Sequence, residues 1–103
     1  MTPEGKVKAL VKRRMEVAFP NGYRFMPVQN GMGAPALDFY YCINGYFVAI
    51  ETKAPGKKPT PRQETTMSDI TKAGGLAFVV DGLASLDRAI ATIATIALVT
   101  YAH

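Results

Sequence analysis

The chain has 103 residues, which leaves room for one hydrophobic core but not for two. Twelve Lys and Arg residues against eight Asp and Glu give a net charge of +4, which favours polyanionic partners. A single cysteine, Cys42, excludes an internal disulfide and is typical of a reducing cytoplasm. The start lacks the basic-then-apolar order of a signal peptide, and the apolar tract near the C-terminus is too short and too interrupted by threonine to span a bilayer. We therefore expect one soluble cytoplasmic domain over residues 1–103, with no membrane contact.

The first predicted element is a helix that begins at Thr2-Pro3-Glu4. This segment offers a capping hydroxyl, a proline at the first helical position and an acid in the first turn. The helix should continue to about Phe19, because Pro20-Asn21-Gly22 follows. By their spacing, the residues expected to face the core are Val7, Leu10, Val11 and Met15, and those expected to lie largely in water are Lys6, Lys8, Lys12 and Arg13.

A β-hairpin is the clearest prediction for the middle of the chain. A strand at about residues 23–28 and a glycine-rich loop at residues 30–35 should precede it. The runs 37–43 and 46–51 are rich in aromatic and β-branched residues, and the pair Asn44-Gly45 between them strongly indicates a two-residue type I′ turn. Cross-strand partners in that hairpin have position numbers that sum to 89.

This register places two carboxylates, Asp38 and Glu51, opposite each other on one face of the sheet. Like charges in that position destabilise a sheet, so the pair calls for a cation between them. Lys53 returns to the same face two residues later. Two acids that can share a hard divalent metal, with an ammonium at the edge, suit phosphodiester hydrolysis.

The second half of the chain predicts a helix, a strand and a helix. Thr60-Pro61-Arg62-Gln63 has the form of a capping box, and Gly74-Gly75 should end the helix that begins there. The continuously apolar run 76–80 is expected to form a buried parallel strand, reached by a right-handed crossover. A last helix should begin at about Ser85.

This last helix is apolar on nearly all sides between residues 89 and 101. A helix of that kind needs a second packing surface, so we expect a homodimer with two-fold symmetry whose interface includes it. The alternative is a helix that is buried wholly within its own domain. Its apolar residues comprise Ile90, Ile93, Ala94, Ala97 and Leu98 on one side, with Ile96 and Val99 on others.

Asp38, then twelve residues, then Glu51-Thr52-Lys53, resembles the PD-(D/E)XK nuclease signature. The segment from Phe47 to Gln63 resembles the diagnostic segment of the virus-type replication-repair nuclease domain, VRR-NUC, and the likeness extends from Glu4 to about Ile90. The family usually has Gly-x-Pro-Asp, whereas here two residues separate Pro35 from Asp38, so the assignment of Asp38 rests partly on the hairpin register.

The resemblance implies an α/β fold, the restriction-endonuclease-like αβββαβ core, with a mixed sheet flanked by helices and followed by a C-terminal helix. It also implies a site that binds Mg²⁺ or Mn²⁺ and needs no nucleotide cofactor. In that site Asp38 and Glu51 are metal ligands, the Thr52 carbonyl can add a ligand, and Lys53 orients or helps to deprotonate the attacking water. Glu4 matches an acid near the metals, and Gln63 matches a supporting glutamine.

Several of these residues have a simpler interpretation. Glu4 suits a helix N-terminus, and Gln63 suits a capping box, without any catalytic role. Three basic residues near the acids, Lys57, Lys58 and Arg62, are expected to contact phosphates, although they could form a solvated loop. The tyrosines at positions 23, 40, 41 and 46 are expected to pack within the sheet rather than to stack on bases, and the terminal His103 builds no site.

The sequence therefore favours a metal-dependent, structure-specific DNA endonuclease from a bacterium or a phage-infected host cell. The resemblance implies a stand-alone homodimer that acts on branched DNA such as four-way (Holliday) junctions. The alternatives are a non-catalytic DNA-binding or assembly module that keeps the nuclease fold, and a subunit of a larger nuclease.

Overall fold

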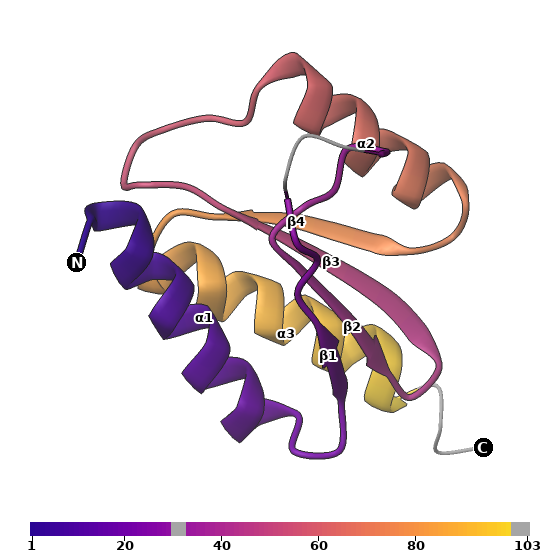
Figure 1. The fold of residues 1–103 in the computed structure, drawn as a ribbon. Coiled ribbons are helices and arrows are strands. Elements are labelled where there is room, and N and C mark those ends of the chain that lie inside the picture. The colour runs from indigo at the N-terminus through magenta and orange to yellow at the C-terminus, as the bar shows by residue number, and fades with distance from the viewer. Residues whose placement is uncertain (30–32, 100–103) are drawn as a thin grey trace.

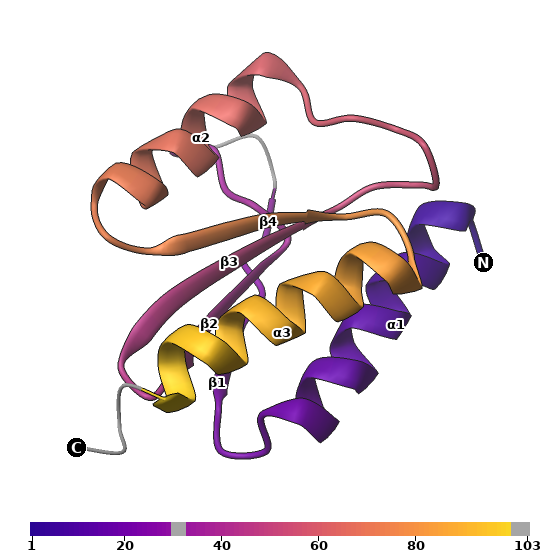
Figure 2. The same cartoon turned by 180° about the vertical axis from the view of Figure 1, so that it is seen from behind.

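The structure, a computed structural model, describes residues 1–29 and 33–99, without the side chain of Val99. Helices α1 and α3 lie together on one face of a four-stranded sheet and α2 lies on the other face (Figures 1 and 2). Strand order is β1-β2-β3-β4, with antiparallel pairing up to β3 and parallel pairing of β3 with β4. This is the expected αβββαβ core with a C-terminal helix. Its elements are α1 (Pro3–Ala18), β1 (Tyr23–Phe25), β2 (Phe39–Ile43), β3 (Tyr46–Thr52), α2 (Pro61–Lys72), β4 (Leu76–Val80) and α3 (Leu83–Val99).

The helix starts follow the capping chemistry of the sequence. The Thr2 hydroxyl accepts a hydrogen bond from the backbone N–H of Gly5 at 3.0 Å, which satisfies one free donor of the first turn of α1. At α2, the Thr60 hydroxyl accepts from the Gln63 N–H, and the Gln63 side chain accepts from the Thr60 N–H, so the predicted capping box is complete.

The hairpin has the predicted register. Asn44 and Gly45 both have positive φ angles, 50° and 84°, as a type I′ turn requires. Ile43 pairs with Tyr46 and Phe39 pairs with Ile50, so partner numbers sum to 89 along β2 and β3. The Asn44 side-chain amide also donates to the carbonyl of Ala97 at 3.2 Å, which ties the turn to α3.

The core lies between the sheet and the pair α1 and α3. Helical spacing brings Val7, Val11 and Met15 of α1 against it, and Leu10 packs at its margin. Residues 39, 41 and 43 of β2 point into this core, whereas residues 40 and 42 point to the α2 side. The largest fully buried side chains include Phe39, Met15, Leu37, Ile50, Leu86 and Ile93.

Three expected elements differ from the observed ones. The first strand ends at Phe25 rather than near residue 28, since Pro27 has no N–H to donate to a ladder. Strand β4 has the expected bounds and direction, yet it forms an edge of the sheet and is mostly half-buried. Helix α3 begins at Leu83, two residues before the expected Ser85, because Gly82 already accepts the first helical hydrogen bond from Leu86.

Helix α3 is covered by its own domain over the described residues. Its inner side, at Leu86, Ala89, Ile93 and Ala97, is buried in the core, and its outer side carries exposed charged and hydroxyl residues such as Arg88. Ile90, Ala94 and Ile96 are half-buried and Leu98 is exposed, while the side chain of Val99 lies outside the described residues. The place of α3 in a dimer interface stays a prediction. None of the described helices is long and apolar enough to cross a membrane.

Candidate active site

Two buried carboxylates form the centre of the candidate site. Asp38 immediately precedes β2 and Glu51 lies near the end of β3, so the hairpin register, continued by one residue, places them opposite each other on the α2 side of the sheet. Their exposed fractions are 9 % and 3 %. Such burial of two acids is costly unless each oxygen has a partner.

The oxygens of Asp38 have polar partners from three segments. Oδ2 accepts hydrogen bonds from the Thr52 backbone N–H at 3.0 Å and from the Thr52 hydroxyl at 2.6 Å. Oδ1 accepts from Nε2 of Gln29 at 3.2 Å and lies 3.5 Å from the Lys8 ammonium. Asp38 is therefore fixed in place by its neighbours in the fold.

Glu51 is held on one oxygen only. Its Oε2 accepts a 2.8 Å hydrogen bond from Nε2 of Gln63 and lies 3.5 Å from Nζ of Lys53. Its Oε1 is buried and has no hydrogen-bond partner. Burial, and next the negative charge of Asp38, raise the pKa of Glu51 to about 7, although the Lys53 ammonium acts in the opposite direction.

A hard divalent cation fits this pair of acids. The bare Oε1 of Glu51 supplies a carboxylate oxygen that nothing else satisfies, and Oδ1 of Asp38 is on the same side of the hairpin. In the described part of the chain no third His, Cys, Asp or Glu joins them. Mg²⁺ commonly binds through one or two carboxylates and keeps several waters, so two acids are a sufficient protein contribution. A role for the Thr52 carbonyl as a further ligand stays a prediction.

Lys8 was expected to lie largely in water, and that prediction was wrong. Its ammonium lies 3.5 Å from Oδ1 of Asp38 and 3.9 Å from Oε2 of Glu4, and the residue is half-buried. Glu4 and Lys8 are one turn apart, so both project from the same side of α1 toward the site. Only tertiary packing brings Asp38 beside Lys8. The signal that the sequence offered was the position of Lys8 four residues after Glu4, a candidate site acid.

Glu4 and Gln63 have different outcomes. Gln63 carries out both roles that the sequence left open, because its backbone and side-chain oxygen complete the capping box while its side-chain nitrogen binds Glu51. Glu4 contacts the site through Lys8 and does not extend the carboxylate pair into a three-acid cluster of the described residues. Its role as a metal ligand stays a prediction. Gln29, which binds Asp38, had no signal in the sequence.

The basic loop between β3 and α2 lies beyond the acids. Lys57, Lys58 and Arg62 are all exposed, and the described ion pairs include none of them. Gly56, at φ 79°, makes the turn in this loop, and its N–H donates to Oδ2 of Asp81 at 3.2 Å. The loop is thus attached to the end of β4 and its cations are free to meet a polyanion.

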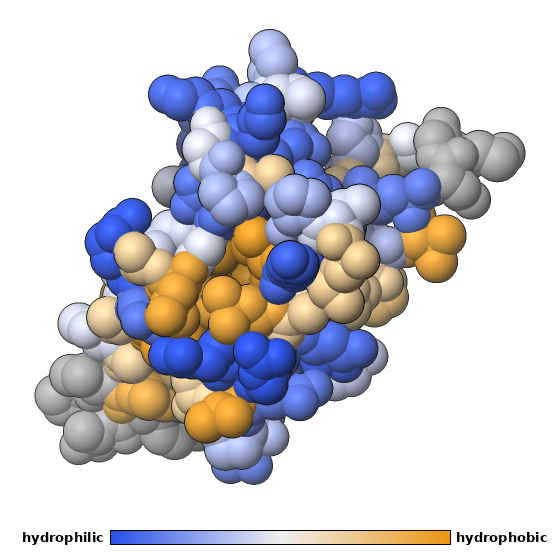
Figure 3. Space-filling view, turned by 90° about the vertical axis from the view of Figure 1, so that its left-hand side faces the viewer, coloured by the Kyte–Doolittle hydropathy of each residue, from blue (hydrophilic) through white to orange (hydrophobic). Residues whose placement is uncertain are grey.

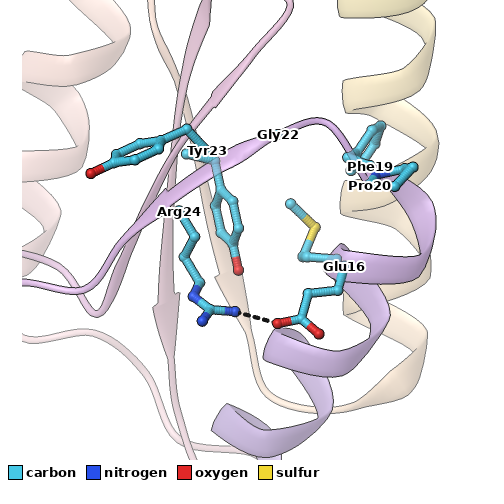
Figure 4. Close-up of a pocket in the computed structure, with 8 residues that line it drawn as sticks. Glu16, Phe19, Pro20, Gly22, Tyr23 and Arg24 are labelled. Atoms are coloured by element: carbon cyan, nitrogen blue, oxygen red, sulfur yellow. Dashed lines mark hydrogen bonds and ion pairs between the residues drawn. The ribbon is translucent and has the colours of Figure 1, made fainter.

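Two other depressions of the surface contain neither carboxylate. One is lined in part by residues of the C-terminal end of α1 and of β1, and Figure 4 shows Arg24 and Glu16 there, joined by a 2.7 Å ion pair. The other lies beside the start of α1 and is lined in part by Val7, Leu10 and Pro55. The side of the molecule at the left of Figure 1 has an apolar area framed by hydrophilic side chains (Figure 3).

Comparison with known proteins supports the fold. No protein-family profile matches the sequence, and no curated protein matches it. A solved structure described as a VRR_NUC domain is similar, with a TM-score of 0.73 and 27 % sequence identity. The match covers 87 % of this chain and 96 % of that one. This chain is therefore similar to a VRR_NUC domain in both fold and sequence along nearly the whole of the two chains.

Proposed function

We propose that this domain is a Mg²⁺- or Mn²⁺-dependent endonuclease that hydrolyses phosphodiester bonds of DNA, and that its preferred substrates are branched, such as four-way junctions. The observation that carries the proposal is the bare, buried Oε1 of Glu51, opposite Asp38 and next to Lys53. A structural role alone gives no reason to bury a carboxylate oxygen without a partner.

Each residue of the site has a task that its contacts allow. Thr52 holds Oδ2 of Asp38, so a metal would bind Oδ1 by displacing one of its present partners, Gln29 or Lys8. Gln63 holds Oε2 of Glu51, which leaves Oε1 for the metal. A bound divalent cation would polarise the scissile phosphate and lower the pKa of a water molecule. Lys53, which is mostly buried beside Glu51, would orient that water and offset the negative charge that develops on the phosphate.

A cleavage assay distinguishes this proposal from two alternatives. A non-catalytic DNA-binding or assembly module would bind DNA without cutting it, and a subunit of a larger nuclease would cut only with its partner. The intact set of two acids and a lysine favours catalysis by this chain. The assay incubates purified protein with four-way, flap, single-stranded and duplex DNA in Mg²⁺, Mn²⁺ or EDTA, and it also shows which DNA structure is preferred.

Glu51→Gln and Lys53→Ala should each reduce cleavage at least about a hundredfold, the usual scale for loss of an electrostatic catalytic group. The matched controls Glu64→Gln and Lys72→Ala alter exposed residues of α2 and should leave cleavage unchanged. Circular dichroism and thermal melting verify that every variant is folded. Cleavage at the wild-type rate by a folded Glu51→Gln or Lys53→Ala would contradict the proposed site.

In EDTA, Glu51 should make the fold less stable as pH rises from about 4.5 to about 7. Over that range the folded carboxyl keeps a proton that the unfolded chain has released, so the free energy of unfolding falls with pH. A tenfold change in proton affinity corresponds to about 1.4 kcal/mol. The rise of the Glu51 pKa from 4.5 to about 7 therefore means that the ionised carboxylate lowers the free energy of unfolding by on the order of 3 kcal/mol. Glu51→Gln should therefore be more stable than wild type at pH 8 and similar to it at pH 5, by urea denaturation.

Glu64→Gln is the control for this measurement, because it removes an exposed carboxyl from the same helix that holds Gln63. Addition of Mg²⁺ at pH 8 should stabilise the wild type and have little effect on Glu51→Gln, since a ligand that binds only the folded state stabilises it. A wild type that melts at the same temperature with and without Mg²⁺ and Mn²⁺ would count against a metal at this pair.

Replacement of Lys57, Lys58 and Arg62 by alanine should weaken DNA binding and flatten its dependence on salt. Each lost phosphate contact removes roughly 0.9 from the slope of log affinity against log salt on duplex DNA. Replacement of three exposed cations of α1, Lys6, Lys12 and Arg13, changes the net charge by the same amount and should have a smaller effect. Fluorescence anisotropy titrations compare the two, and equal slopes would assign the loop cations to a solvated surface.

We also propose that two copies of the chain form a homodimer, as the family resemblance implies. Within the described residues the outer edge of β4 has no neighbouring strand, and an apolar edge strand of this kind can pair with another chain. Two-fold symmetry would present two sites to the two strands cut in a four-way junction. Sedimentation equilibrium at micromolar concentration should give the mass of two chains, and the mass of one chain would contradict the dimer.

A further inference from the structure

The α2 side of the sheet carries an aromatic hollow that the proposed cleavage chemistry does not use. Helix α2 packs mainly against β4 and β3, rather than against β1 and β2. A pocket of about 370 Å³ lies there and is lined mainly by aromatic residues. We call it the aromatic hollow, and its lining residues are Tyr23, Phe25, Tyr40, Tyr41, Cys42 and Phe47.

Three rings of the hollow are exposed rather than packed into the core. Tyr23 is 70 % exposed, Phe25 is 54 % exposed and Phe47 is 49 % exposed. The expectation that the tyrosines pack within the sheet holds for Tyr41 and Tyr46, which belong to the core or its margin, but it is wrong for Tyr23. An aromatic surface of this extent on a small domain marks a binding site.

One ring of the hollow is held in place. The Tyr40 hydroxyl accepts a 3.0 Å hydrogen bond from the backbone N–H of Leu37, in the segment that leads to Asp38. Its ring lies 5.2 Å from that of Phe47, with a tilt of 34°. These two rings form the wall of the hollow nearest to the carboxylates. Because they are already ordered, a ligand that binds them loses little free energy to the ordering of side chains.

The hollow lies on the same face of the sheet as the candidate active site. Tyr40 follows Asp38 by two residues, and Phe47 precedes Glu51 by four, with side chains on the same face in both strands. Along a strand, two residues span about 7 Å and four span about 13 Å. A DNA strand whose phosphate meets the carboxylates and that follows this face of the sheet would therefore pass over the hollow.

We propose that the aromatic hollow binds unpaired nucleobases of the strand whose phosphate lies at Asp38 and Glu51. This inference rests on the proposed nuclease function and adds to it a substrate class: DNA with unpaired nucleotides beside the cut, as in a single strand, a flap or an opened junction. Every base has a π face that stacks on an aromatic ring, so a lining made mainly of aromatic rings accepts any base. Bases of an intact duplex are already stacked and paired, so they have no free face for these rings.

A second copy of the chain fits the hollow less well than a base does. In a two-fold contact the same patch meets itself, so a concave patch would face its own copy and leave space unfilled. A subunit over Tyr40 would also crowd Asp38, two residues away, where DNA has to enter. The cations that would hold the phosphates, Lys53 and the loop that carries Lys57 and Lys58, lie at the carboxylate end of this surface.

The test measures binding without cleavage. Full-length wild-type protein in EDTA at low salt is titrated into a single-stranded oligonucleotide that carries 2-aminopurine, whose fluorescence falls when the base stacks. We expect quenching for this strand, much less quenching when 2-aminopurine is paired within a duplex, and weaker binding of an oligonucleotide that contains abasic sites. Tyr23→Ala with Phe47→Ala should remove the quenching and reduce affinity for the single strand about tenfold or more.

Two variants separate stacking from folding. Tyr23→Phe with Phe47→Tyr keeps both rings and should retain the quenching, whereas Val17→Ala, which shortens an exposed apolar residue of α1 on the other side of the sheet, should change nothing. Equal affinity of the alanine variant and the wild type would overturn the proposal. So would sedimentation equilibrium in which the alanine variant alone loses a dimer, because the hollow would then be a subunit interface.

The result does not depend on the outcome of the cleavage assays. Wild-type protein that shows quenching but cuts no DNA in Mg²⁺ or Mn²⁺ would refute the nuclease proposal while the base site stands. Wild-type protein that cuts DNA but shows no quenching would refute the base site alone.

Discussion

The opposition of two buried carboxylates across one hairpin is the constraint on which the rest of this structure depends. A hairpin with a two-residue turn has a fixed register, and that register brings Asp38 and Glu51 together. A shift by one residue would turn both acids toward the core and the core residues of β2 toward water. The Asn44-Gly45 turn, in which both residues have the positive φ angles of a type I′ turn, thus determines at the same time where the core is and where the acids meet.

The surrounding fold neutralises this pair only in part. Asp38 is satisfied on both oxygens, by Thr52 on one and by Gln29 and Lys8 on the other. Glu51 has an oxygen without a partner and a pKa near 7, so the ionised group opposes folding when no cation is bound. A sequence selected for stability alone would have a neutral residue at this position. The retained cost is understandable if a cation binds there, because its binding free energy then contributes to the stability of the folded state.

Local signals in the sequence were sufficient for the fold and for half of the site. Capping residues, the Asn-Gly turn and strand alternation act between near neighbours, so they predicted α1, α2, the hairpin and the facing acids. The contacts of Lys8 and Gln29 with Asp38 are tertiary. The spacing of Lys8 from Glu4 was the one local signal for them, and Gln29 gave none. For the same reason α3 was expected to need a partner subunit: its apolar residues were visible, but the sheet and α1, which cover them, were not.

The extent of α2 divides one face of the sheet into two regions with different chemistry. Where α2 lies over β3 and β4, Gln63 reaches Glu51 and the acids are shielded from water. Beyond α2, the same face carries exposed rings, because β1 is short and the segment after it leaves the sheet at Phe25. Side chains alternate between the two faces of a strand, so some residues of β1 and β2 have to lie on this face, beyond the cover of α2. Aromatic residues at these positions, directly in line with the carboxylates, turn an uncovered part of a small sheet into a surface that continues the site.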